Sequence, residues 1–184
     1  YGVRQVVHLF LLLTAPLMWG TVYGFFALDD RDDGISAVLS ASPVSPLHLL
    51  LLRLLAPALV TVVYALGLIL LLPLPAADGM LWAGAIVMIA LEAPLTTLII
   101  AGLAANKVEG LAVSKASSLL FVGAVVGLLL PEPQALLGMI APQYWVVVPL
   151  LRPVGGVGSG TLIVAGVLFH LLLIALLACR YNRR

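Results

Sequence analysis

The sequence predicts an all-α integral membrane protein, a polytopic helical bundle with about five transmembrane helices in a single domain. Only 9% of the 184 residues are charged and 63% are hydrophobic, whereas a soluble domain has roughly 25% charged residues. Apolar stretches of about 20 residues recur, and each can cross a hydrocarbon layer roughly 30 Å thick as a helix. These apolar stretches make the lipid bilayer the expected partner. The net charge of +1 and the lack of a basic stripe argue against nucleic acid as a partner.

Five apolar stretches account for most of the chain. The first contains Pro16, which is tolerated in a membrane helix, and ends at the charged run Asp29-Asp30-Arg31-Asp32-Asp33, which cannot enter hydrocarbon. Ser45 followed by Pro46 is typical of a helix start, so the second span begins there. The expected spans cover about residues 6–28, 47–72, 80–105, 111–130 and 161–178.

Two segments lie outside these spans. In the segment 29–45, Ile35, Val38 and Leu39 occupy one face of a short helix, with Asp33 as a possible N-cap. The segment 131–160 is apolar but divided by prolines, so we expect interfacial or re-entrant half-helices on the external side, with Tyr144 and Trp145 as aromatic anchors. An external gate is the alternative role for this aromatic pair.

The Lys and Arg residues divide unequally between the two sides of this map. One side receives only Arg4 and Arg152. The other receives Arg31, Arg53, Lys107, Lys115, Arg180, Arg183 and Arg184. Because cytoplasmic loops carry the excess of positive charge, the segment 29–45 and the C-terminus are predicted to be cytoplasmic. An odd number of spans then leaves Tyr1 outside, which we would expect if a further span preceded it.

Three motifs, in this order, resemble the type-2 ABC exporter permeases, and specifically the drug or fluoroquinolone export permease branch. The first is the acidic turn that ends at Gly34, with the entry Pro43-Val44-Ser45 into the next span. The second is the polar break Asn106-Lys107-Val108-Glu109-Gly110, and the third is Pro142-Gln143-Tyr144-Trp145. The resemblance covers nearly the whole chain, except that the family's first span and its preceding amphipathic helix are absent.

The resemblance implies a multi-pass permease of the bacterial inner membrane that exports a hydrophobic or amphiphilic substrate, drug-like or lipid. It would pair with a second permease subunit and sit on ATP-binding cassette subunits, which bind and hydrolyse the ATP. The chain itself would then be neither an enzyme nor a cofactor-binding protein. In agreement, the glycine-rich stretch 155–161 lacks the lysine of a phosphate-binding loop. The residues expected to couple to the ATPase are Asp29, Asp30, Arg31, Asp33, Gly34, Ile35, Val38, Leu39, Lys107 and Glu109.

Two ionisable residues fall deep inside predicted spans. Glu92 is near the middle of the third span and His170 is about as deep in the last. A charged side chain at that depth costs roughly 2.5–3.5 kcal/mol, so Glu92 must face protein or water, or stay protonated. We hypothesise that the two line a polar part of the translocation path, sharing a proton or hydrogen bond if their helices touch. The alternative is a neutral packing role for Glu92 and an unrelated His170.

Other classes of function remain as alternatives. A proton-coupled secondary transporter could use Glu92 and His170 as its relay, although the chain shows no convincing internal repeat. A membrane-embedded enzyme would need a metal set or a nucleophile with its base, and the scattered histidines His8, His48 and His170 do not supply one. A structural membrane protein is the third alternative.

Overall fold

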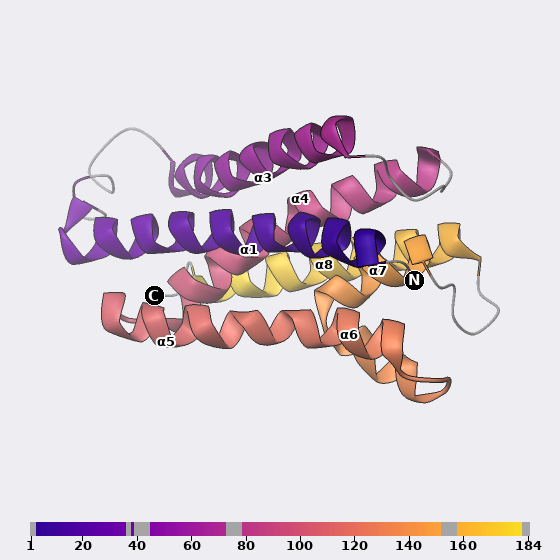
Figure 1. Ribbon diagram of the computed structural model, residues 1–184. Helices are drawn as coiled ribbons and strands as arrows, with labels where there is room; N and C mark the ends of the chain where they lie inside the picture. The colour runs from indigo at the N-terminus through magenta and orange to yellow at the C-terminus, as the bar shows by residue number, and fades with distance from the viewer. Residues whose placement is uncertain (1–2, 36–37, 39–44, 73–78, 152–157, 182–184) are drawn as a thin grey trace.

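The computed structural model describes residues 3–35, 38, 45–72, 79–151 and 158–181, and these parts form helices and turns without a strand. The helices are α1 (Val3–Asp32), α3 (Pro46–Leu71), α4 (Gly79–Leu103), α5 (Lys107–Ser117), η1 (Ser118–Leu120), α6 (Phe121–Leu129), η2 (Gln134–Ile140), α7 (Pro142–Leu151) and α8 (Ser159–Tyr181). The long helices lie roughly parallel and antiparallel in one bundle (Figure 1). Five segments are long and apolar enough to span a membrane, and α5, η1 and α6 together form one of them. The all-helical membrane fold is therefore confirmed.

The first span ends later than the sequence predicted. α1 continues to Asp32, because an exposed charged residue can remain helical once it has left the apolar layer. The helix ends where Gly34 adopts a φ of 69°, in the left-handed region that glycine reaches without strain. The N–H of Asp33 still donates to the carbonyl of Asp29 at 2.9 Å. Glycine, and not the charge itself, stops this helix.

Local caps fix two other helix starts. The Oγ of Ser45 accepts from the N–H of His48 at 3.3 Å and Pro46 opens α3, as predicted. The side chain of Asn106 accepts from the N–H of Glu109 at 3.0 Å, and the Glu109 carboxylate accepts from the N–H of Ala105 at 2.8 Å. This reciprocal capping starts α5 at Lys107, four residues before the predicted start of the fourth span.

The helix α4 lies at the centre of the bundle. It packs against α1, α3, α5, α7 and α8, and 67% of its apolar window is buried, compared with 17% for α3 and for α8. Gly20 and Gly24 bring α1 close to it, since an added Cβ on Gly20 would lie 2.6 Å from the Ala93 carbonyl oxygen. The Thr97 hydroxyl also donates to the Gly20 carbonyl at 3.1 Å. The two helices are therefore closely joined.

The half-helices expected in the segment 131–160 correspond to η2 and α7. Most of α7 is buried inside the bundle, where it packs against α4, α6 and α8. An interfacial helix would expose one face, so the re-entrant arrangement fits α7, whereas η2 exposes Leu137 and Ile140 and fits an interfacial position. Residues 152–157 lie outside the described part of the chain.

Candidate functional site

Three polar side chains from different helices meet inside the bundle. Glu92 on α4 is 2% exposed, while Gln143 on α7 and His170 on α8 are fully buried. The Nε2 of His170 lies 3.8 Å from the Oε1 of Glu92, and the Gln143 amide approaches the same carboxyl group. We call these three residues the buried polar cluster. The structure thus brings together the two residues that the sequence placed at similar depth.

The hydrogen bonding of His170 fixes its tautomer. Its Nδ1 lies 2.7 Å from the carbonyl oxygen of Gly166, and because a carbonyl oxygen only accepts, Nδ1 must carry a proton. The Nε2 facing Glu92 is then either a bare acceptor or a second N–H. An ionised carboxylate facing a bare Nε2 would oppose two lone pairs in a dry interior, so one proton between the groups stabilises the pair.

The distance between Glu92 and His170 determines which interaction the two side chains make. At 3.8 Å the pair is within ion-pair distance but too far apart for a direct hydrogen bond. Within the described part of the chain, neither oxygen of Glu92 and neither end of the Gln143 amide has a hydrogen-bond partner. Buried polar groups are rarely left in this state in a fixed core, so the cluster is suited to a rearrangement in which its partners change.

Sequence reasoning did not identify Gln143. The signal available was its type and place, an amide in an otherwise apolar stretch next to Tyr144 and Trp145. Burying an isolated polar side chain is costly unless it contacts another polar group, so such a residue is expected to have a polar partner inside the protein. Its partner on α4 could not be found from spacing, because the contact depends on α7 folding back into the bundle.

The aromatic pair Tyr144 and Trp145 is not placed as predicted. Tyr144 is fully buried and packs against Gly127 and Gly138, so its assignment as a lipid-interface anchor is wrong. Trp145 is partly buried, and its Nε1–H donates to the carbonyl of Met139 at 2.9 Å, which joins α7 to η2. Both rings belong to the packing around the re-entrant segment. An external gate remains a prediction.

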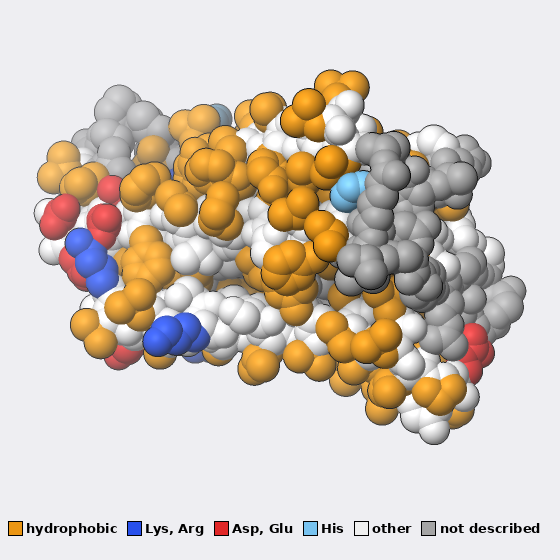
Figure 2. Space-filling view, viewed as in Figure 1, with side chains coloured by type: hydrophobic (Ala, Val, Ile, Leu, Met, Phe, Trp, Pro, Cys, Tyr) orange, Lys and Arg blue, Asp and Glu red, His pale blue; other side chains and the backbone are white. Residues whose placement is uncertain are grey.

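Charged residues gather at one end of the bundle, where α1 stops (Figure 2). Asp29 pairs with Lys107 at 2.6 Å, although 78 positions separate them in the chain. Asp30 pairs with Arg53 on α3, and Arg53 also donates to the Tyr181 hydroxyl at 2.7 Å. We call these five residues and Arg31 the charged end. Arg53 therefore connects α3 to α1 and α8.

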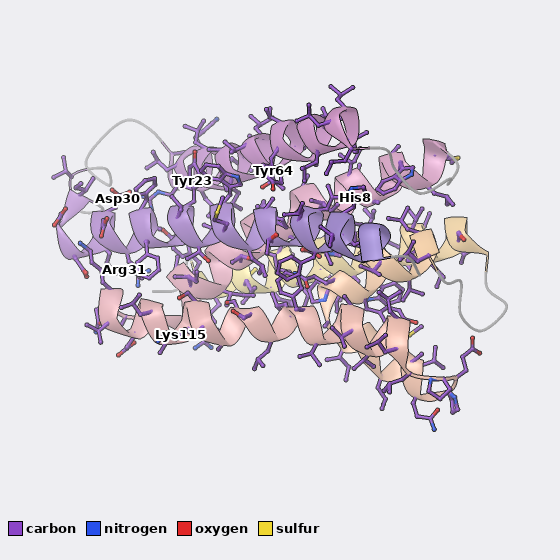
Figure 3. All side chains as sticks on the ribbon, viewed as in Figure 1. His8, Tyr23, Asp30, Arg31, Tyr64 and Lys115 are labelled. Carbon is purple, nitrogen blue, oxygen red and sulfur yellow. The ribbon has the colours of Figure 1, made fainter. Side chains whose placement is uncertain are left out.

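Arg31 has a different kind of partner. Its Nη1 donates to the Ala104 carbonyl at 3.0 Å and its Nη2 donates to the Ala101 carbonyl at 2.9 Å. In Figure 3, Asp30 and Arg31 leave the end of α1 on opposite sides, with Arg31 on the side that faces α5. Both were predicted to contact an ATPase. The structure gives their side chains partners within the bundle, and the coupling role stays a prediction.

The remaining predicted coupling residues divide into two groups. Asp33, Gly34, Ile35 and Val38 are exposed beyond the charged end, with Ile35 40% and Val38 72% accessible. Glu109 is also exposed, but its carboxylate caps α5. Leu39 lies outside the described residues. The exposed part of this segment therefore includes the apolar side chains Ile35 and Val38, whereas the carboxylates of Asp29 and Asp30 are held in ion pairs.

Comparison with known proteins places the chain in a family. The family model described as "Fluoroquinolones export permease protein Rv2686c-like" matches residues 3–178, which includes the buried polar cluster and every residue of the charged end except Tyr181. Among curated proteins and among solved structures, no significant match was found. The chain therefore belongs to the Rv2686c-like family of fluoroquinolone export permease proteins.

Proposed function

We propose that this membrane permease is the translocation subunit of an ATP-driven exporter, and that a separate ATP-binding subunit pushes on the segment that follows α1. The observation that carries the proposal is the pair of exposed apolar side chains Ile35 and Val38, placed just beyond the charged end. Apolar side chains at an aqueous helix end are stabilised when a partner covers them. The family match supports export as the direction of transport.

The charge distribution supports a cytoplasmic position for this end. Every Lys and Arg whose side chain the structure describes lies toward the charged end of the bundle, and these are Arg31, Arg53, Lys107, Lys115 and Arg180. The positive-inside rule then orients α1, α5 and the end of α8 toward the cytoplasm of a bacterial inner membrane. ATP is available on that side, which is where the motor subunit would bind.

The permease would work as a pair, with a second copy or a related subunit completing the path for an amphiphilic drug. The buried polar cluster is the part of each subunit suited to change during transport, because α4, α7 and α8 meet there. A change in the contact between Glu92 and His170 alters how α4 packs on α8. ATP hydrolysis on the partner would supply the energy for that change.

Transport into inside-out membrane vesicles tests this proposal. The vesicles contain the permease with the ATP-binding subunit that co-purifies with it, and the substrate is a fluoroquinolone followed by its own fluorescence. ATP should drive uptake, and a protonophore should leave uptake in place. Failure of any ATP-binding subunit to co-purify, or uptake that ignores ATP, contradicts the proposal.

The coupling segment has its own variant test. Replacing Ile35 and Val38 with Asp should uncouple ATP hydrolysis from uptake while membrane insertion stays normal. Leu137→Asp is the matched control, because Leu137 is 65% exposed and lies in η2 at the opposite end of the bundle. Equal uptake by the Ile35/Val38 variant and the control would refute the assignment of this segment.

A proton-coupled secondary transporter is the second candidate, favoured by one observation. Glu92 and His170 lie 3.8 Å apart in the interior, and such pairs serve as proton relays in transporters. In that case the protonophore should abolish vesicle uptake and ATP should be dispensable. Glu92→Gln, which keeps the shape and removes the acid, should then abolish exchange.

A further inference from the structure

We propose that Arg31 is the positioning residue that transmits movement of the coupling segment to α4 and so to the buried polar cluster. The inference rests on the proposed function and adds a mechanical route inside the permease. It starts from the two hydrogen bonds of the guanidinium group to the carbonyls of Ala101 and Ala104. Ala101 lies in the last turn of the central helix that carries Glu92, and Ala104 directly follows that helix.

The end of α4 is built so that Arg31 is needed there. The last carbonyls of a helix have no partner within the helix. The N–H of Ala105 would normally bond to the Ala101 carbonyl, but it donates to the Glu109 carboxylate at 2.8 Å instead. Arg31 supplies the missing donor, and its fixed fork of N–H groups holds two carbonyls at once.

Three consecutive residues of α1 each hold a different helix, but the links differ in kind. Asp29 holds α5 and Asp30 holds α3 through single contacts between flexible side chains. The Asp29–Lys107 pair is also well exposed, at 39% and 52%, so solvent screens it. Arg31 differs because it binds backbone carbonyls, which move with the main chain. Of the three links, it is the one that passes a displacement of α1 to backbone and not to a flexible side chain.

Further contacts make α1 and α4 one mechanical body. The Thr97 hydroxyl bonds to the Gly20 carbonyl, and the glycines Gly20 and Gly24 place the helices in direct contact. Ile35 lies four positions beyond Arg31 and Val38 lies seven beyond it, so a push at either side chain acts on this joined pair of helices. Since α4 meets α8 at the Glu92–His170 pair, the contact that changes is the one inside the buried polar cluster.

The test compares Arg31→Gln with Lys115→Gln, a change at an exposed lysine of α5, in the complete permease–ATPase complex in lipid nanodiscs or vesicles. Both variants lose one positive charge at the same end of the bundle, but only the first loses the link to the α4 backbone. We measure the stoichiometry of the complex, basal ATP hydrolysis and fluoroquinolone transported per ATP hydrolysed. Transport per ATP should fall by about tenfold for Arg31→Gln, the equivalent of losing a hydrogen bond to a charged donor. Lys115→Gln should stay within about twofold, because solvent screens its exposed charge.

Arg31→Lys provides an intermediate variant that keeps the charge and one donor, so it should recover part of the lost transport per ATP. Equal transport per ATP in Arg31→Gln and Lys115→Gln would overturn the inference. So would loss of the ATPase from the Arg31→Gln complex, since Arg31 would then be a docking residue. A lower yield of folded Arg31→Gln with normal transport per ATP would show a helix cap and nothing more. Failure of the proposed function can be told apart from failure of this inference, because in that case even the unmodified complex would show no ATP-driven transport.

Discussion

Removing His170 should show how much the contact with Glu92 contributes to the free energy of unfolding, because the two side chains face each other and have few other polar neighbours. Opposite charges 3.8 Å apart attract by about 4 kcal/mol at an effective dielectric constant of about 20, and burial of both groups offsets part of this. The perturbation is His170→Leu, which fills similar space without a proton acceptor. We expect it to lower the free energy of unfolding by about 3 kcal/mol, since it leaves an acid in the interior without a partner.

The comparison with Glu92→Gln isolates the pair. That single change should cost less than about 1 kcal/mol, because a neutral amide of the same shape replaces the acid and leaves no charge to bury. In the Glu92→Gln background, His170→Leu should therefore cost at least about 1 kcal/mol less than it does beside the native acid. Reversible unfolding in lipid bicelles, measured for all four members of this cycle, gives the coupling free energy.

The refuting result is additivity. If His170→Leu costs the same in both backgrounds, within about 0.5 kcal/mol, Glu92 and His170 do not share a proton or a charge. Glu92 would then be the neutral packing residue that the sequence left as an alternative. The measurement does not depend on transport, so it examines the pair without any assumption about the motor.

Three other changes probe the packing around these sites. Gly20→Ala should destabilise the protein by about 1–3 kcal/mol, since the new methyl group meets Thr96 and the α4 backbone. Gly67→Ala is the control and should not destabilise it, because nothing lies within 4 Å of the added Cβ. Thermal unfolding in detergent compares the two variants. Asn106→Ala should cost about 1 kcal/mol through loss of the α5 cap, and hydrogen exchange at the N–H of residue 109 should rise. Tyr144→Ala should cost about 3–5 kcal/mol because the ring is buried, whereas an interfacial anchor would give a small change in the same unfolding assay.

Composition and local signals predicted most of the fold. Five spans follow from apolar length, because only helices can satisfy the backbone in hydrocarbon. Ser45-Pro46 marked the start of α3, since capping depends on neighbours in the sequence. The end of α1 was misplaced because charge was weighed above Gly34, although a left-handed glycine is what stops a helix.

The site was only partly accessible to the same reasoning. The sequence predicted that Glu92 and His170 lie at similar depth in the membrane, because depth can be estimated by counting residues along each span. The positions of Gln143 and Tyr144 depend on α7 turning back into the bundle, which a short proline-containing segment does not reveal. The bonds of Arg31 to the end of α4 join positions 70 and more apart in the chain, so periodicity within one helix gives no sign of them.

The most direct measurement of the central claim is cysteine labelling at the end of α1 with a membrane-impermeant maleimide. Cys179, the native and exposed cysteine, is first replaced by Ala. Ile35→Cys and Glu132→Cys then mark the charged end and the opposite end of the bundle. The account predicts that Ile35→Cys reacts in inside-out vesicles and is protected when the ATP-binding subunit is bound, while Glu132→Cys reacts only in right-side-out vesicles. Labelling of Ile35→Cys from the outer side, or labelling unaffected by the partner, would contradict it.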